Sequence, residues 1–375
     1  MKKILFIATY GDFLATFELS NISIAMELGC EVHCAANFTE ENYNRKIDRL
    51  KNLGVKLHEV DFARSPFKTK NLTAYANLKK IIRTEKIDIL DCHNAVVSVY
   101  ARLAAKKCKL EKVIYTPHSF FFYKGCPRKN ELIYKNVERF FSRYTDILVC
   151  INEEDYEAAL QMPMRGKAIY VPGVGIDVNE IKSLPKMRGK YCEEFGIPKD
   201  SYIMVSVGEL ISRKNHILAL QAFKNANIPN SYYLICGIGE LMDELKKEAI
   251  NLGIENRVVF TGYRKDVKQI MKSSDLFIFP SLQEGLPVAL MEAMACGIPC
   301  IASKIRGNVD LIDENKGGLL FNPMDAVELC CKMRDISNDT EKSKEFGEFN
   351  STKINTFDIE NIQAIMSREY KNIIQ

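Results

Sequence analysis

Residues 279–299 read FPSLQEGLPVALMEAMACGIP and contain a complete local folding pattern. An apolar run ends at a proline, a short loop carries Glu284, and helical spacing continues until Gly297. We predict a strand, an acidic loop and a helix that opens at Leu286 with Pro287 in its first turn, because proline is favoured where helices begin and glycine just beyond their ends. The free backbone N–H groups at such a helix start can bind a diphosphate.

Apolar runs rich in β-branched residues alternate with helical spacing on both sides of this segment, across all 375 residues. This alternation is typical of βα units around buried parallel sheets. It pauses in the Pro- and Gly-containing stretch 170–175, where we place a hinge between two doubly wound α/β domains. The expected strands are 4–8, 31–35, 55–60, 87–92, 113–116 and 147–151 in the first half, and 203–208, 232–236, 257–260, 276–279, 299–302 and 318–321 in the second.

We therefore expect one domain at 1–175, a second at 176–355, and a closing helix in 356–375 that packs back across the hinge. The helix is indicated by apolar residues at helical spacing, such as Ile362 and Met366. In doubly wound sheets, ligands bind beyond the carboxyl ends of the strands, so the loops after the strands should carry the site residues.

The composition, 47% hydrophobic and 27% charged, supplies enough apolar material for two such domains. The first apolar run is too short for a secretory signal, and no run approaches the roughly 18 apolar residues of a membrane helix. The 12 cysteines are scattered through expected strands and helices, which indicates reduced thiols. These features predict a soluble, cytoplasmic protein.

Charge is unevenly distributed along the chain. Residues 1–175 carry 27 Lys and Arg against 20 Asp and Glu, while the remainder carries 25 against 28. A basic first domain suggests contact with an anionic acceptor or an anionic membrane surface, through residues such as Arg128 and Lys129; the alternative is an ordinary solvated surface. Nucleic-acid binding has little support, because the aromatic run 120–123 has no interleaved basic residues.

The blocks Glu-Gly-Leu-Pro at 284–287 and Glu-Ala-Met-Ala-Cys-Gly-Ile-Pro at 292–299 resemble the signature of the family 4 retaining glycosyltransferases. The resemblance is closest to members that act in bacterial capsule and exopolysaccharide synthesis. It implies the GT-B fold, in which two facing Rossmann-like domains with doubly wound parallel sheets enclose a cleft. The first domain would bind the acceptor and the second the nucleotide sugar.

The same resemblance implies roles for the residues of this block. Glu284 would contact the transferred sugar, and Glu292 would accept hydrogen bonds from the nucleotide ribose. Gly285, Leu286 and Pro287 would line the diphosphate. Taken alone, the two glutamates could also be a helix cap and a solvated helical position.

Residues 206–216 read SVGELISRKNH and lead from a strand into a basic loop. Cations held there could neutralise a leaving diphosphate, which a metal ion would otherwise do. Lys214 stands where the family keeps its phosphate-binding lysine, close to the donor-side Gly208. The family's usual arginine is replaced by Glu209, so we expect Arg213 to be the partner cation; the alternative is a solvated loop.

Residues 115–125 form an apolar loop after a strand and should line a cleft. This loop resembles the acceptor-side domain of the same family, where a histidine lies beside the donor sugar, and this implies that role for His118. Lys124 on the same loop is an acceptor-side candidate. His93 and Asn94 are further candidates, because they follow the strand at 87–92.

Three more loops follow strands. Gly11 is what remains of the paired glycines in the family's first loop, so it is implied to lie near the phosphates, with Asp12 as an acceptor-side candidate. Tyr263 and Arg264 match the loop that borders the nucleobase.

We expect neither a metal nor a cofactor. The chain has no Asp-x-Asp pair, and the cysteine pairs at 30/34 and 296/300 have no accompanying histidines. The expected enzyme is a metal-independent hexosyltransferase. It would move a hexose or N-acetylhexosamine, with retention, from a UDP-linked sugar to a polyprenyl-diphosphate-linked oligosaccharide in capsule, exopolysaccharide or O-antigen synthesis, at the inner face of the plasma membrane.

Three alternatives remain at this point. A nucleotide-sugar epimerase or hydrolase of related fold would bind the same donor. An NAD-dependent oxidoreductase is suggested by Gly237 and Gly239, but Met242 stands where the third glycine of the dinucleotide motif belongs. A noncatalytic sugar-binding module would not explain the cations beside Glu284.

Overall fold

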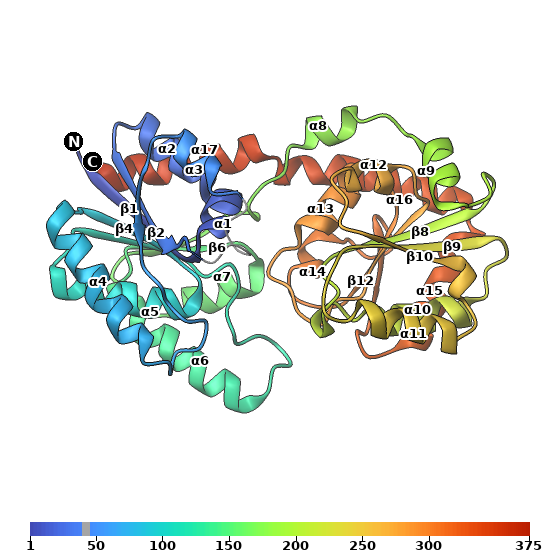
Figure 1. Ribbon diagram of the computed structural model, residues 1–375, viewed down its shortest axis with the longest axis horizontal. Coiled ribbons are helices and arrows are strands. Elements are labelled where there is room, and N and C mark those ends of the chain that lie inside the picture. The colour runs from blue at the N-terminus through green and yellow to red at the C-terminus, as the bar shows by residue number, and fades with distance from the viewer. Residues whose placement is uncertain (40–45) are drawn as a thin grey trace. The chain divides into compact units, whose positions relative to one another are not determined.

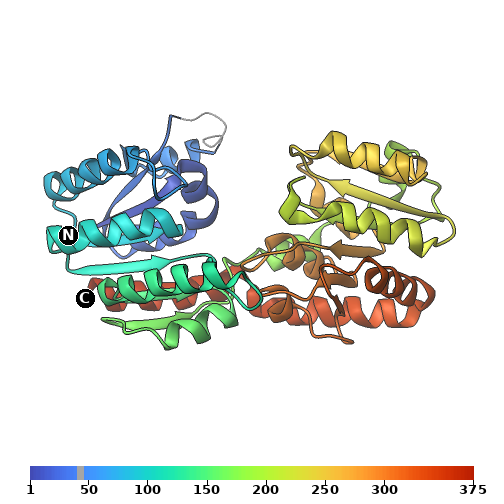
Figure 2. The same cartoon turned by 90° about the horizontal axis from the view of Figure 1, so that it is seen from below.

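The structure, a computed structural model, describes residues 1–39 and 46–375. Its contacts divide into two compact units: unit 1 comprises Met1–Val174 with Glu360–Gln375, and unit 2 comprises Gly175–Ile359. Both chain ends lie in unit 1 (Figures 1 and 2). From the sequence we expected Gly175 in the first domain and residues 356–359 in the C-terminal segment. All of these residues fall in unit 2. The reason is that Ile176 exchanges backbone hydrogen bonds with Phe357 and Ile359 at 3.2 and 2.9 Å.

Unit 1 is built on a seven-stranded parallel sheet with the order β3-β2-β1-β4-β5-β6-β7. The order reverses beside β1, so the loops after β1 and β4 meet at a point where doubly wound sheets bind ligands. The strands are β1 Lys3–Tyr10, β2 Glu31–Asn37, β3 Lys56–Glu59, β4 Ile89–His93, β5 Lys112–Thr116, β6 Ile147–Cys150 and β7 Lys167–Tyr170.

Helices cover both faces of this sheet because its central strands are apolar on both sides (Figure 1). One core contains residues of α4, α5 and α7, and the other contains residues of α2, α3 and α17. The helices are α1 Gly11–Phe13, the π-helix η1 Leu14–Glu18, α2 Leu19–Glu27, α3 Asp48–Asn52, α4 Lys70–Glu85, α5 Ala95–Cys108, α6 Arg128–Phe141, η3 Ser142–Tyr144, α7 Glu153–Leu160 and α17 Ile359–Ile374.

Unit 2 has a six-stranded parallel sheet with the order β10-β9-β8-β11-β12-β13, which reverses beside β8. Its strands are β8 Tyr202–Val207, β9 Ser231–Cys236, β10 Val258–Gly262, β11 Leu276–Phe279, β12 Cys300–Ser303 and β13 Gly318–Phe321. Its helices are α8 Val178–Ser183, α9 Arg188–Phe195, η4 Ser212–Lys214, α10 His216–Ala226, α11 Met242–Asn251, η5 Glu255–Arg257, α12 Val267–Lys272, α13 Val288–Ala295, α14 Asn308–Leu311, α15 Ala326–Asn338, α16 Thr340–Lys353 and η6 Ile354–Phe357.

Each expected strand overlaps an observed one, and two details differ. The sequence analysis missed β7, a half-exposed edge strand whose alternation is weak. It also placed the start of α13 at Leu286 with Pro287 in the first turn. That start is wrong: Pro287 is the N-cap, because its ψ of 119° is extended, and the helix begins at Val288. Among the described residues, no helix is long and apolar enough to cross a membrane.

Candidate functional site

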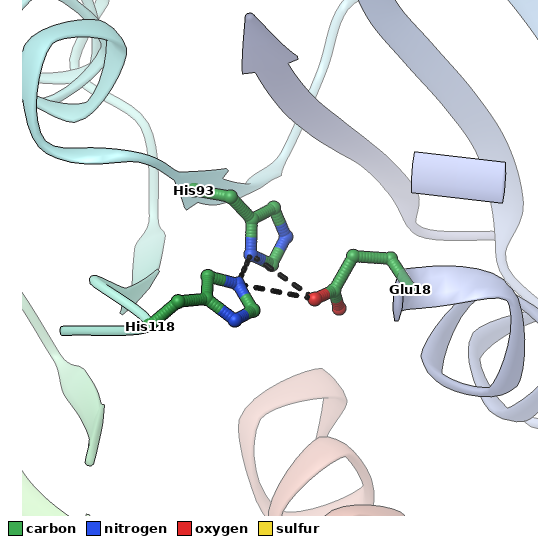
Figure 3. Close-up of side chains that lie close together, drawn as sticks. All are labelled: Glu18, His93 and His118. Carbon is green, nitrogen blue, oxygen red and sulfur yellow. Dashed lines mark hydrogen bonds and ion pairs between the residues drawn. The ribbon is translucent and has the colours of Figure 1, made fainter. Parts of the chain in front are cut away.

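Three side chains from separate elements of unit 1 converge beyond the carboxyl ends of its strands (Figure 3). His93 is the last residue of β4, His118 follows β5, and Glu18 ends the π-helix η1. The Glu18 Oε1 atom lies 3.4 Å from His93 Nδ1 and 3.3 Å from His118 Nε2, and these two nitrogens lie 3.3 Å apart. The three groups thus share one contact point.

The backbone around this point is strained and firmly held. His118 has a φ of 59° and Asn94 a φ of 63°, which place both in the left-handed region that side chains other than glycine rarely adopt. Such conformations cost about 1–3 kcal/mol each and persist where the surroundings impose them. Here the first turn of α7 holds the loop, because Asp155 Oδ2 accepts the Phe120 N–H at 3.1 Å and Glu154 Oε1 accepts the Lys124 N–H at 2.6 Å.

Burial and mutual contact shift the pKa values of Glu18 and His93. Burial alone would raise the pKa of Glu18, but His93, His118 and the amide of Asn21 together lower it below its ordinary value. Burial lowers the pKa of His93 to about 4, although Glu18 opposes that shift. At neutral pH His93 is therefore neutral.

Behind His93 lies a second carboxyl group. Asp91 is 1% exposed, and its Oδ2 accepts a hydrogen bond from the hydroxyl of Tyr370 on α17. Burial, with the charge of Glu18 next in size, raises the pKa of Asp91 well above its ordinary value, and the Tyr370 bond opposes the shift. The two buried carboxyl groups of the cluster, Glu18 and Asp91, thus have pKa values shifted in opposite directions.

One carboxylate and two imidazoles are ligands that divalent transition metals accept. Among the described residues, Glu18, His93 and His118 are the group whose potential ligand atoms come together, all within 4.8 Å of one another. The expectation that the protein binds no metal stays a prediction.

The other candidates in unit 1 do not all reach this cluster. Gly11 is buried at the start of α1, and Asp12 accepts the Lys46 N–H at 2.6 Å. Asn94 Oδ1 accepts the Thr9 N–H at 3.0 Å, and Asn94 lines a largely apolar pocket of about 270 Å³ together with Phe121 and other residues. Lys124 lines a different pocket, of about 290 Å³.

In unit 2, the expected donor residues Glu284, Lys214 and Arg213 are in direct contact. Lys214 Nζ donates to Glu284 Oε1 at 2.7 Å, and Arg213 Nη1 donates to the same oxygen at 2.9 Å. Arg213 also donates to the Gln283 carbonyl at 2.7 Å. The basic loop after β8 is thereby attached to the acidic loop after β11, and the two cations stand beside one carboxylate.

Close backbone packing fixes the acidic loop. Gly307 has a φ of 78°, and a Cβ on it would lie 2.1 Å from the Gly285 carbonyl oxygen. Arg306, which is 5% exposed, donates to the Glu284 carbonyl at 3.4 Å. Leu286 is buried, so its side chain anchors the loop that leads into α13. The unpaired N–H groups of the first turn of α13 follow directly.

Glu292 lies in the second turn of α13 and is partly buried. Burial raises its pKa above the ordinary value, while the nearby Lys268 opposes the shift. A carboxyl group in such surroundings is suited to accept hydrogen bonds from a polar ligand, because it is partly desolvated and such bonds replace those to water.

Gly208, Tyr263 and Arg264 line one pocket of unit 2, with a volume of about 230 Å³, at the ends of β8, β9 and β10. Tyr263 is 67% exposed, which leaves its ring free to contact a ligand. Arg264 is held by Asp266 at 2.8 Å and by Glu194, and both carboxylates raise its pKa. The guanidinium is therefore paired within the protein.

The sequence analysis missed Glu18, Asp91, Tyr370 and Arg306. The spacing Asp91-x-His93 at the end of a strand was a usable signal, since alternate residues of a strand share a face. Nothing local marks Glu18 or Tyr370, because each belongs to a helix whose packing partner lies far away in the sequence.

Comparisons with known proteins identify relatives of this chain. Residues 187–353 match the family described as Glycosyl transferases group 1, and residues 25–180 match Glycosyltransferase Family 4. EpsD of Bacillus subtilis (strain 168), which is named as a glycosyltransferase, is 32% identical over 360 residues, covering 92% of this chain and 90% of EpsD. An Escherichia coli UDP-Gal:alpha-D-GlcNAc-diphosphoundecaprenol alpha-1,3-galactosyltransferase is 33% identical over 263 residues, 67% of each chain.

Solved structures show the fold. Anabaena Alr3699/HepE, crystallised with UDP-glucose, superimposes with a TM-score of 0.80 at 20% identity, covering 99% of this chain and 100% of that one. The lipopolysaccharide glycosyltransferase WaaG superimposes with a TM-score of 0.70 at 17% identity, covering 97% and 98%. The chain is a glycosyltransferase of GT-B fold. It belongs to glycosyltransferase family 4.

Proposed function

We propose that this enzyme transfers a hexose or an N-acetylhexosamine from a UDP-sugar to an oligosaccharide carried on a polyprenyl diphosphate, with retention of the anomeric configuration. The product would belong to a capsule, an exopolysaccharide or an O-antigen. The observation that carries the proposal is the contact of Lys214 and Arg213 with Glu284, which places two cations and a carboxylate beside the start of α13. The name of the E. coli relative, which gives UDP-Gal and a diphosphoundecaprenol acceptor, supports the nucleotide and the acceptor.

On the donor side, each part of a nucleotide sugar has a counterpart in unit 2. The pocket with Tyr263 takes the nucleobase, and Glu292 accepts hydrogen bonds from the ribose. The Gly285–Pro287 turn and the first N–H groups of α13 receive the diphosphate, because a helix N-terminus attracts anions. Glu284 binds hydroxyl groups of the sugar.

In the reaction, the acceptor hydroxyl attacks the anomeric carbon on the face from which the diphosphate leaves. The new carbon–oxygen bond forms as the bond to the phosphate oxygen breaks, and that phosphate oxygen takes the acceptor proton. Lys214 and Arg213 stabilise the developing phosphate charge, so the diphosphate requires no metal ion. His118 positions the sugar, and Asp12, His93, Asn94 and Lys124 lie on the acceptor side.

The acceptor suggests work at the inner face of the plasma membrane, with α6 as the docking surface. Leu132 and Ile133 on α6 are 67% and 47% exposed, and the rings of Tyr134 and the exposed Phe121 lie in a tilted contact with their centroids 5.3 Å apart. Arg128, like Lys129 and Lys135, is exposed on the same helix. Exposed apolar and basic residues on one helix are typical of binding to anionic lipid surfaces.

The test is a donor and acceptor panel. Purified protein is incubated with UDP-Gal, UDP-Glc, UDP-GlcNAc, UDP-GalNAc and GDP-Man, with and without a short-chain polyprenyl-diphosphate GlcNAc acceptor, in the presence of EDTA. We expect one UDP-sugar to give an acceptor-dependent disaccharide with the anomeric configuration of the donor. Conversion of donor at the same rate without acceptor would show an epimerase or hydrolase instead.

A further inference from the structure

Three side-chain atoms of unit 1 form an almost equilateral triangle (Figure 3). Glu18 Oε1 lies 3.4 Å from His93 Nδ1 and 3.3 Å from His118 Nε2, and the two nitrogens are 3.3 Å apart. Glu18 and His93 are 1% exposed or less, and the side chain of His118 is 16% exposed. Polar atoms from three separate segments of the chain thus surround one common position.

Hydrogen bonds alone cannot complete this triangle. A ring nitrogen of histidine carries either one hydrogen or one lone pair in the plane of the ring, so it takes full part in only one directed hydrogen bond. Each of the two nitrogens, however, stands in two of the three contacts. Hydrogens therefore satisfy at most two of the contacts. A cation at the common position would accept a lone pair from all three atoms at once.

The size of the triangle matches a tetrahedral zinc ion. Zn²⁺ binds imidazole nitrogen at about 2.0–2.1 Å and carboxylate oxygen at similar distances, and a tetrahedral ion with such bonds keeps its ligand atoms about 3.3–3.4 Å apart. An octahedral ion with bonds of the same length, such as Mg²⁺, requires neighbouring ligand atoms about 2.8–3.0 Å apart and prefers oxygen ligands. The spacing and the two imidazoles both favour zinc.

The groups behind the triangle are those that support metal ligands. Asn21 Nδ2 donates to Glu18 Oε2 at 2.7 Å, which leaves Oε1 for an ion. On the far side of His93, Asp91 Oδ1 lies 3.4 Å from Nε2, and Tyr370 donates to the other oxygen of Asp91. Neither Asp91 Oδ1 nor His93 Nε2 has a hydrogen-bond partner among the described residues. Metal-bound histidines usually direct their second nitrogen at such a carboxylate.

The triangle is accessible from one side. Glu18 and His118 border a pocket of about 30 Å³ in unit 1. A water molecule needs a cavity of roughly 10–15 Å³, so this pocket has room for one. Three protein ligands leave the fourth tetrahedral position of a zinc ion open, and a water molecule from the pocket can fill it.

We propose that Glu18, His93 and His118 bind one Zn²⁺ ion, which joins η1, the end of β4 and the loop after β5. The sequence-based expectation of no metal differs from this proposal, because it considered only ligands that are close together in the sequence. The ion belongs to unit 1, so the proposed role of Lys214 and Arg213 in unit 2 is unaffected. Zinc binding is measured without any sugar, so failure of the proposed function would leave the proposal intact.

A second group of the same residue types provides a matched control. His33 contacts His58 through Nδ1 at 2.9 Å and Glu31 through Nε2 at 3.1 Å. The two partners thus approach different nitrogens of the His33 ring, and the three groups do not surround one position. His58→Gln should therefore leave zinc binding unchanged.

The test is a zinc titration of the purified full chain, which is first stripped of metal with EDTA and then titrated against a chromophoric chelator. We expect one equivalent of tightly bound zinc in the wild type and in His58→Gln, and its loss in His118→Asn, where asparagine tolerates the φ of 59°. Asp91→Asn should keep the site but weaken zinc binding by about 10–100-fold. No tight zinc in the wild type, or unchanged binding in His118→Asn, overturns the proposal.

Cobalt spectroscopy distinguishes this site from the 12 cysteines of the chain. Co²⁺ in the stripped wild type should give the visible bands of a tetrahedral ion with nitrogen and oxygen ligands, and Glu18→Gln should lose them. A near-ultraviolet thiolate charge-transfer band would place the metal on cysteine and overturn the proposal. If His118→Asn does not fold, the wild-type spectrum and Glu18→Gln still decide.

Discussion

Lys214 and Glu284 form a 2.7 Å ion pair although 70 positions separate them in the sequence. Each residue comes from a loop at the carboxyl end of a strand, β8 for Lys214 and β11 for Glu284, and these strands are neighbours in the sheet of unit 2. The topology of the sheet thus assembles the proposed donor site. Arg213 shares the same oxygen, so it can supply the second cation in place of the arginine that Glu209 replaces.

Lys214→Ala should lower kcat/KM for the nucleotide sugar by about 100-fold, because loss of one preorganised donor at a developing anion costs roughly that much. The measurement is initial rate against donor concentration in the coupled transfer assay. Lys246→Ala, an exposed lysine on α11, is the matched control and should behave as wild type. Equal rates for the two variants would contradict a role of Lys214 in binding the diphosphate.

Gly307→Ala should weaken donor binding and lower the free energy of unfolding by roughly 1–3 kcal/mol, because the new Cβ would meet the Gly285 carbonyl at 2.1 Å and shift the acidic loop. Gly253→Ala is the control: its φ of 64° is similarly unfavourable, but nothing lies within 4 Å of a Cβ there. Urea unfolding and UDP titration calorimetry measure the two effects. Weaker UDP binding in Gly253→Ala as well would argue against a local clash.

Stability should fall as the pH drops from about 6.5 to about 4, and His216 should account for part of the loss. Burial, followed by the charge of Lys214, lowers the pKa of His216 to about 4. Between these pH values His216 is protonated in the unfolded chain but not in the folded chain. This difference lowers the free energy of unfolding by up to about 3 kcal/mol. In urea unfolding across this range, His216→Gln should show a shallower pH dependence than wild type. Parallel curves would contradict the shift.

Leu132→Ser combined with Ile133→Ser should reduce binding to phosphatidylglycerol vesicles by roughly tenfold, because apolar contacts and basic side chains of α6 act together in interfacial binding. Leu160→Ser is the control, since Leu160 is 56% exposed at the end of α7. Flotation at low and high salt provides the measurement, and wild-type binding should weaken as salt screens the basic residues. Salt-insensitive binding, or equal loss in the control, would point to another surface.

Much of the fold could be predicted because its signals are local. Buried parallel strands are continuous apolar runs, and the residues that follow them must lie at the ligand-binding edge of the sheet. That reasoning placed Glu284, Lys214 and His118 in loops of the correct kind. It failed at β7, an edge strand in which no residue is fully buried, and at Pro287, whose extended backbone delays the start of α13 by two residues.

The sequence by itself determined the two α/β units, the family and the strand-loop-helix around Glu284, because each depends on neighbouring residues. Only the tertiary structure decided which polar groups are in contact. Tyr370 lies 279 positions from Asp91, and the loop of His118 joins Glu18 only because η1 ends beside β4. Burial then raises the pKa of Asp91 and lowers that of His93, since removal from water disfavours the charged form of each group.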